Sequence, residues 1–250
     1  MKLKDINAHN RDIRVKFDKE PHLYYVDGKK YDISVTGFVK LFFQEFNADV
    51  IIEKNYQKWQ ENKDSKYYGL DINKIKRIWS ENAKESSKLG SILHNDIELF
   101  QNNIHIKNET VEFQYFLNFN ERVSDKLIPY RTEWIIFDER IKLAGSIDMC
   151  YKDKNGNTIL IDWKRSKKIS KENSFRSGKK PLNHIPDSNF WHYSLQLNMY
   201  KYILEKNYDI NVSSMHIVKL HPNQDNYSII TIPNLQKEIN LMIEHRNTVC

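Results

Sequence analysis

Cysteine is almost absent from this chain: its 250 residues include only Cys150 and Cys250. Two cysteines fit neither a disulfide framework nor a cysteine-based zinc site, so both classes of protein are excluded. Cys150 stands inside an apolar run, and we expect its thiol to be buried in packing.

Long apolar runs are absent as well. No run approaches the ~20 residues that a membrane-spanning helix needs. The N-terminal stretch MKLKDINAHNRDIRVKF has no apolar signal-peptide core, and its Asp5 and Asp12 argue against a transit peptide. We therefore expect a soluble, intracellular protein with no membrane partner, in a compartment that the sequence does not identify.

Positive charge is in only small excess over negative charge. The chain has 39 Lys and Arg against 33 Asp and Glu, a formal net charge of +6. A mildly basic balance suits a polyanionic partner, but it is common among ordinary intracellular proteins and carries little weight. The hydrophobic content of 40% is enough for one sizeable core, or at most for two small domains.

Hydrophobic periodicity changes along the chain from helical to strand-like and back. Helical spacing predicts helices over residues 34–46, 48–63, 72–103 (with a break near 86–90), 110–126, 189–207 and 234–247. Short apolar runs and turn residues predict strands within 13–34, with a hairpin turn at Asp27–Gly28, within 130–166, and at 213–222 and 226–233. Residues 167–189 are polar and predict a loop. This order indicates one α/β domain with a helical N-terminal part.

Two aspartates interrupt the strand-like region. Asp148 and Asp162 stand in neighbouring apolar runs, and a turn at residues 153–157 would fold these runs into an antiparallel pair. Lys164 lies two residues after Asp162 and therefore on the same face of its strand. Two close carboxylates repel each other unless a cation separates them, and Mg²⁺ accepts such oxygen ligands. The alternative is an ordinary charge pair on a solvated sheet face.

Two helices carry further polar pairs at a spacing of four residues. His94 and Glu98 share one helical face, where an imidazole with an acidic neighbour can present a metal ligand. Gln196 and Tyr200 share a face of the helix predicted at 189–207. The alternatives are a half-buried surface histidine in the first helix, and a core tyrosine on an ordinary amphipathic helix in the second.

Taken in order, these residues resemble the RecB-type branch of the PD-(D/E)xK nuclease superfamily. The matching motifs are G-x-x-x-H-x-x-x-E (Gly90, His94, Glu98), G-x-x-D (Gly145–Asp148), D-x-K (Asp162–Lys164) and Q-x-x-x-Y (Gln196–Tyr200). The branch includes the RecB and AddB nuclease domains, CRISPR-associated RecB-like nucleases and the mitochondrial genome maintenance exonuclease. The stretch HLYYVDGKKYDISVTGFVKLF is similar to an N-terminal segment of viral, phage and mitochondrial members.

The resemblance implies a restriction-endonuclease-like α/β fold, in which helices flank a central mixed sheet. It implies a single nuclease domain over residues 1–250. Within that domain, the hairpin and helices of residues 1–75 would roof the site, and residues 76–250 would form the PD-(D/E)xK core.

The resemblance also implies a metal site and its chemistry. Mg²⁺ or Mn²⁺ would be held by His94, Asp148, Asp162 and the backbone carbonyl of Trp163, with Glu98 and Glu133 as extra or second-metal ligands. The catalytic set would be Asp148, Asp162, Lys164, Glu98, Gln196 and Tyr200. Lys164 would orient water or stabilise charge on the phosphate; burial would lower the pKa of its amine, while the carboxylates would oppose this.

Three features depart from relatives in this branch. Trp163 occupies the middle of D-x-K, where Tyr or a small residue is commoner, and we expect its side chain to point outward and to be free to vary. No cysteine quartet for an iron–sulfur cluster is present. The motif G-x-x-x-x-G-K-[ST] is missing, so any helicase or recombination partner would be a separate chain.

Basic residues follow the D-x-K motif. We predict phosphate contacts from Arg165, Lys167, Lys168, Lys171, Arg176, Lys179 and Lys180, the alternative being a solvated flexible loop. Four aromatic residues, Phe175, Phe190, Trp191 and Tyr193, could stack on bases, although the predicted helix divides Trp191 and Tyr193 between core and rim.

The function expected from all of this is a metal-dependent DNA exonuclease, acting on single-stranded ends or flaps in replication, repair or recombination. A structure-specific endonuclease and a non-catalytic nucleic-acid-binding module on a nuclease fold are the alternatives. No residue identifies a reader of the 2′-hydroxyl, so RNA stays open as a substrate.

Overall fold

The computed structural model describes the backbone of residues 1–249, and the side chains up to residue 246. Cys250 lies outside the described residues. The chain divides into two compact units. One comprises Met1–Gln44 with Leu93–Cys250, and the other comprises Glu45–Ile92.

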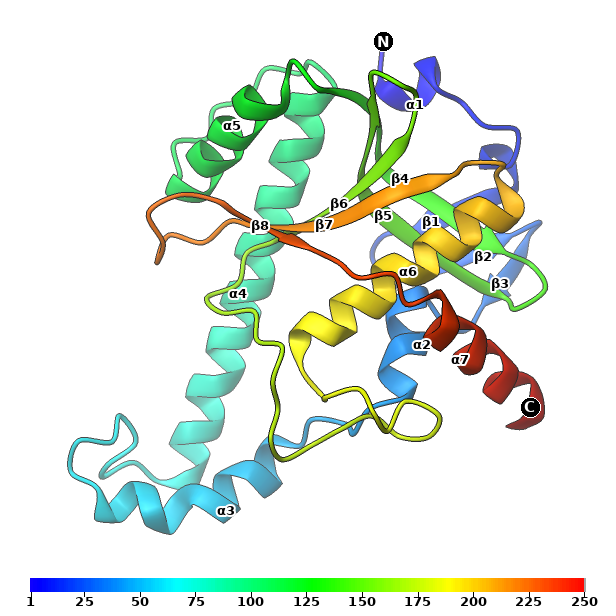
Figure 1. The fold of residues 1–250 in the computed structure, drawn as a ribbon. Coiled ribbons are helices and arrows are strands. Elements are labelled where there is room, and N and C mark those ends of the chain that lie inside the picture. Colours follow the sequence, from blue (N-terminus) through cyan, green and yellow to red (C-terminus); the bar gives the residue numbers. More distant parts are fainter. Residues whose placement is uncertain (250) are drawn as a thin grey trace. The chain divides into compact units, whose positions relative to one another are not determined.

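A five-stranded mixed sheet forms the centre of the larger unit (Figure 1). Its strands, in spatial order, are β4 (Leu127–Asp138), β5 (Leu143–Asp153), β6 (Thr158–Lys164), β7 (Val212–Lys219) and β8 (Ser228–Thr231). Neighbours are antiparallel except β6 and β7, which are parallel. The long helix α6 (Asn189–Asn207) lies in the connection between these two strands, as a parallel pair requires. The predicted mixed α/β architecture is confirmed.

Apolar side chains alternate between the two faces of this sheet. On one face Met149, Ile161 and Trp163 pack with α5 (Val111–Val123) and with Leu93 near the end of α4 (Ile72–Gln101). On the other face Cys150 and Leu160 join a cluster formed by α2 (Val35–Leu41), α6 and α7 (Gln236–Val249). Cys150 is fully buried, as predicted. Both faces are therefore covered, which is why β5 and β6 read as nearly continuous apolar runs.

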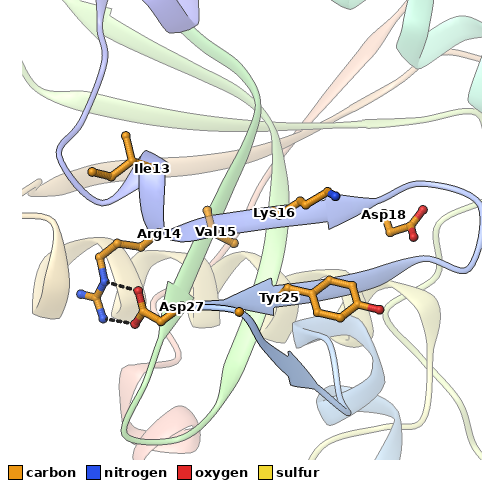
Figure 2. Close-up of a pocket in the computed structure, with 8 residues that line it drawn as sticks. Ile13, Arg14, Val15, Lys16, Asp18, Tyr25 and Asp27 are labelled. Atoms are coloured by element: carbon orange, nitrogen blue, oxygen red, sulfur yellow. Dashed lines mark hydrogen bonds and ion pairs between the residues drawn. The ribbon is translucent and has the colours of Figure 1, made fainter.

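The N-terminal segment adds a small sheet to the larger unit. It begins with α1 (Leu3–Ile6) and a 3₁₀ turn, followed by β1 (Val15–Asp18), β2 (Leu23–Val26) and β3 (Lys29–Tyr31). The predicted hairpin turn is confirmed: Asp27 and Gly28 join β2 to β3 with φ of 49° and 75°. Figure 2 shows Arg14 and Asp27 side by side at one end of the β1–β2 pair. The Arg14 guanidinium donates two hydrogen bonds to the Asp27 carboxylate, at 3.0 and 2.6 Å.

The smaller unit contains α3 (Ala48–Glu61) and the first part of α4. Its core is Ile52, Tyr67 and Ile75, with Trp59 and Trp79 packed around them. Both helices were predicted, but the expected break near residues 86–90 is wrong, because α4 runs unbroken over 30 residues. A Cβ added at Gly90 would lie in open space. The glycine therefore destabilises the helix only through its low helix propensity, by about 1 kcal/mol relative to alanine. The roof over the site stays a prediction.

The predicted loop over residues 167–189 is also confirmed, since the structure assigns no helix or strand between β6 and α6. Among the described residues, no helix is long and apolar enough to cross a membrane.

Candidate functional site

Three acidic residues stand at one level across neighbouring strands. On β4 Glu133 lies between the pairs Thr132–Met149 and Trp134–Ile147, opposite Asp148 of β5. Asp162 of β6 comes one residue after the Met149–Ile161 pair, again opposite Asp148. The antiparallel pairing predicted from the turn at residues 153–157 is confirmed, and it is this register that aligns the acids.

Helix α4 brings His94 to this row. Its Nδ1 lies 3.5 Å from Asp148 Oδ2 and 3.8 Å from Glu133 Oε1, and its Nε2 lies 2.9 Å from the carbonyl oxygen of Trp163. One ligand atom from each of His94, Glu133 and Asp148 lies within 4.8 Å of the other two. Asp148 Oδ2 also accepts a hydrogen bond from the Trp163 backbone N–H at 2.9 Å, which ties β5 to β6 beside the histidine.

Glu133 is held in an unfavourable backbone conformation. Its φ is 42°, a value that non-glycine residues rarely adopt within a strand. Ser146 Oγ donates a hydrogen bond to Glu133 Oε2 at 2.9 Å and orients the carboxylate. Backbone strain of this kind costs about 1–3 kcal/mol and concentrates at functional positions. The sequence analysis missed Ser146, although its position two residues before Asp148 places both on one face of β5.

Asp162 pairs with Lys164 and lies outside the group around His94. Lys164 Nζ is 2.6 Å from Asp162 Oδ2, and their side chains are only 19% and 3% exposed. The contact is ionic without hydrogen-bond geometry, so Oδ2 is a buried oxygen with no hydrogen bond among the described residues. Of the predicted ligands, His94, Asp148 and Glu133 therefore lie within one group, whereas Asp162 contacts Lys164, and its role as a metal ligand stays a prediction.

The ionisable groups of this region shift one another. Burial lowers the pKa of His94, but the attraction of Asp148 and Glu133 outweighs it and raises the pKa to about 9. Burial raises the pKa of Asp148, and it raises that of Asp162 to about 6 despite Lys164. Burial lowers the pKa of the Lys164 amine, but the attraction of Asp162 and Asp148 is stronger and raises it above its ordinary value. At neutral pH the Asp162–Lys164 pair is accordingly charged.

Tyr200 and Gln196 of α6 contact each other, and Tyr200 packs against β5. Tyr200 is 3% exposed, and its ring packs so closely on β5 that a Cβ on Gly145 would come within 2.7 Å of its Cε1. Gln196 Nε2 donates a hydrogen bond to the Tyr200 hydroxyl at 3.0 Å. One turn earlier on α6, the ring of Tyr193 lies 4.9 Å from Lys164 Nζ. The sequence predicts Tyr193 to stack on bases or to lie at the core or rim of the helix, and does not predict its contact with Lys164; its position three residues before Gln196, on the same helical face, is the signal that points to it.

Glu98 lies outside the group around His94, and the Trp163 side chain points the other way from the one predicted. Glu98 is half-buried one turn after His94, outside the group of three, and burial together with Glu133 raises its pKa. The expectation that the Trp163 side chain points outward is wrong, because it is 1% exposed and packs edge-on against Phe116 and Phe119. Its strand is buried on both faces, so the residue between Asp162 and Lys164 enters the core under α5.

The predicted DNA-contacting residues divide into two groups. Lys167, Lys168, Lys171, Lys179 and Lys180 are exposed and Arg176 is half-buried. Arg165 is only 13% exposed, and its Nε lies 2.6 Å from Glu112. Of the aromatic candidates, Phe175 is 95% exposed, whereas Phe190 is 2% exposed and its ring face is not open to a base. The stacking role expected of Phe190 is therefore wrong.

The donor atoms of this site fit a divalent cation. An imidazole and two carboxylates converge, and the Trp163 carbonyl lies at the other ring nitrogen of His94. Oxygen donors of this kind suit hard cations, and imidazole extends the range to manganese. The donor set does not distinguish Mg²⁺ from Mn²⁺.

Fold and site together define an α/β protein with a charged cluster at one level of a mixed sheet. Scans against protein-family models and curated proteins find no match. Among solved structures, the chain is similar to one described as "Crystal structure of SSO0001", with 17% identity over 87% of this chain and 74% of that chain. The TM-score of 0.36 is too low for that likeness to support any argument.

Proposed function

We propose that this protein is a metal-dependent deoxyribonuclease with a PD-(D/E)xK core, acting as an exonuclease on single-stranded ends or flaps. One observation carries the proposal. His94, Glu133 and Asp148 converge beside a buried Asp162–Lys164 pair, so that acids, an imidazole and an ammonium meet at one level of the sheet. A structural role alone gives no reason to bury so many charged groups together, because each must be taken out of water.

In this mechanism His94, Glu133 and Asp148 hold Mg²⁺ or Mn²⁺, with the Trp163 carbonyl as a further donor. When bound, the cation polarises a phosphate and lowers the pKa of a water molecule. The carboxylates raise the pKa of the Lys164 amine, which favours its ammonium form over the free amine that a general base requires. Its ammonium instead stabilises negative charge on the phosphate. Asp162 positions that ammonium through their 2.6 Å contact, and the Tyr193 ring covers it from α6.

The substrate in this proposal is DNA, with RNA as the second choice. The exposed lysines that follow Lys164 bind phosphates, so affinity falls as salt concentration rises. A helicase or recombination protein, if one takes part, supplies the duplex unwinding from a separate chain.

End-labelled DNA tests this proposal. Purified protein with Mg²⁺ or Mn²⁺ should digest linear single-stranded DNA, and Lys164→Ala and Asp148→Asn should each lower the rate by more than about 100-fold. Lys154→Ala, an exposed lysine in the β5–β6 turn, is the matched control and should digest normally. Activity that survives both site substitutions contradicts the assignment.

A covalently closed single-stranded circle separates the alternatives. An exonuclease leaves the circle intact, whereas a structure-specific endonuclease opens it. A protein that binds DNA but digests neither linear nor circular substrates with either metal is a non-catalytic binding module.

A further inference from the structure

Phe175 is the most exposed large apolar side chain of the loop between β6 and α6. It is 95% exposed, and no other large apolar side chain of residues 167–189 is exposed to a comparable degree. Tyr151, Phe116 and Phe119, by contrast, are all fully buried, so the fold has room for aromatic rings in its cores. This loop therefore places one aromatic ring in solvent, 11 residues after Lys164.

Hydrogen bonds order the backbone on both sides of Phe175. Asn173 Oδ1 accepts from the backbone N–H groups of Phe175 and Arg176, at 3.0 and 3.2 Å. Asn173 Nδ2 donates to the Asp187 carbonyl at 2.5 Å, and the Asp187 N–H donates back to the Arg176 carbonyl at 3.0 Å. The ring is thus presented by an ordered turn, and a ligand would not have to pay for ordering a free loop.

The next residues fasten the turn to the body of the larger unit. Gly178 N–H donates to the Ile185 carbonyl at 2.8 Å, and Lys179 N–H donates to the Phe42 carbonyl at 2.7 Å. A Cβ at Gly178 would lie 2.6 Å from the Leu182 carbonyl oxygen, so the close approach requires glycine.

The loop that carries the ring has an excess of positive charge. Residues 167–189 contain six basic residues and two acidic ones, 6 − 2 = +4 with His184 neutral: Lys167, Lys168, Lys171, Arg176, Lys179 and Lys180 against Glu172 and Asp187. The Asp187 carboxylate is only 11% exposed and lies 2.9 Å from His192 Nε2, so it does little to offset the lysines at the surface.

We propose that this loop is a binding site for single-stranded DNA, in which Phe175 stacks on an unpaired base and the flanking cations contact the phosphates. The proposal rests on the proposed nuclease function for its choice of DNA, and it adds a source of strand selectivity. In a duplex both faces of each base are already stacked, so a protruding ring gains nothing, whereas the lysines bind either form.

An anionic lipid surface is the other polyanion that a basic, aromatic loop could meet. Interfacial membrane binding relies on a broad apolar face, typically of an amphipathic helix. Here one ring stands alone among cations, which matches a base-stacking contact and not a lipid-inserting face.

Fluorescence anisotropy with a labelled oligothymidylate and a matched hairpin duplex tests the proposal, with EDTA present so that nothing is cleaved. Phe175→Ala should weaken binding of the single strand about ten-fold, the factor that corresponds to about 1.4 kcal/mol of stacking. Binding of the duplex should change less than about two-fold, since its contacts are electrostatic. Phe175→Trp should retain the affinity for the single strand.

Tyr68→Ala is the control, an exposed aromatic (46%) of the smaller unit, and it should bind both probes as the unmodified protein does. Phe175 makes no core contact, so its variants should unfold at the unmodified temperature. Equal loss on both probes, no loss, or Phe175-dependent binding to phosphatidylserine vesicles without binding to DNA would each overturn the proposal. If Phe175→Ala weakens single-strand binding selectively but the unmodified protein never digests DNA, only the proposed nuclease function is refuted. If the protein digests DNA normally but Phe175→Ala does not weaken single-strand binding selectively, only this inference is refuted.

Discussion

His94 links two strands' carboxylates to a third strand's backbone, because it contacts Asp148 and Glu133 through one ring nitrogen and the Trp163 carbonyl through the other. In the absence of a cation, its own positive charge compensates the two carboxylates. A bound cation would replace that charge, so the histidine must give up its proton for the metal to bind. The imidazole and the cation therefore compete for the same pair of acids.

Metal-free protein should lose stability as the pH rises. The pKa of His94 is about 9 in the folded protein and 6.5 ordinarily, so the folded state holds the proton more tightly. This contribution is complete below pH 6.5 and is lost as the pH rises through about 9, by at most about 3 kcal/mol. Urea unfolding in EDTA between pH 6 and 9.5 measures it.

His94→Gln should flatten this dependence, whereas His105→Gln, which changes an exposed histidine, should leave it intact. The interpretation of His94 as a compensating cation fails if the His94→Gln protein loses as much stability over this interval as the unmodified protein.

Gly145 is required because the Tyr200 ring packs directly against it. A Cβ at this position would approach Tyr200 Cε1 to 2.7 Å and the Val35 Cβ to 3.2 Å. Gly145→Ala should therefore lower the free energy of unfolding by about 1–3 kcal/mol, the usual effect of overpacking. Chemical denaturation measures the change, and the double variant with Tyr200→Ala should show a smaller additional loss.

Gly90→Ala is the matched control, because its Cβ would enter open space within a helix. It should be neutral or stabilise the protein by up to about 1 kcal/mol. A Gly145→Ala protein as stable as this control would show that Tyr200 does not need the glycine.

Helices α6 and α7 are joined by one buried amide. Asn198 on α6 is fully buried; its Oδ1 accepts from the Leu235 N–H at 2.8 Å, and its Nδ2 donates to the Pro233 carbonyl at 2.9 Å. Gln236 Nε2 returns a bond to the Asn198 carbonyl at 2.8 Å. The Asn198 side chain of α6 therefore forms hydrogen bonds with backbone groups of the segment that leads into α7. Backbone N–H groups at the start of a helix have no partner within the helix and need one from outside it.

Asn198→Ala should destabilise the protein by about 2–4 kcal/mol, because it leaves the buried Leu235 N–H without its acceptor and also removes the donor to the Pro233 carbonyl. Thermal unfolding measures the loss, and Asn211→Ala, at an exposed asparagine just before β7, should stay within about 0.5 kcal/mol of the unmodified protein. Equal stability of the two variants would mean that the amide does not hold these helices together.

The whole larger unit should respond to a cation, because all three donor residues belong to it. A ligand that binds only the folded state at 100 times its Kd adds about 2.7 kcal/mol of stability. Mn²⁺ should therefore raise the unfolding temperature by several degrees, and calorimetry at increasing Mn²⁺ concentration measures the rise.

Asp148→Asn should abolish this rise, and Asp225→Asn, which changes an exposed acid on the loop between β7 and β8, should preserve it. An unchanged rise in the Asp148→Asn protein would place the cation elsewhere.

Most of the secondary structure could be predicted because its signals are local. The helix predicted at 189–207 agrees with α6 at both ends, and the turns at Asp27–Gly28 and Asn155–Gly156 lie where the sequence placed them. The predicted break in α4 failed for the opposite reason: small and polar residues are ambiguous in sequence, and nothing in the folded chain interrupts the helix there.

Strand alternation and one turn align Asp148 with Asp162 and place Lys164 on the face of Asp162, so these contacts could be inferred from sequence. The division of the charged residues follows from tertiary structure: Glu133 joins His94 and Asp148, while Asp162 pairs with Lys164. That division depends on how α4, which precedes the three strands in the chain, brings His94 to β4 and β5. The same holds for Trp163, whose burial follows from the packing of α5 over its strand. Local patterns specify faces and turns, whereas charge pairing follows from which faces are brought into contact.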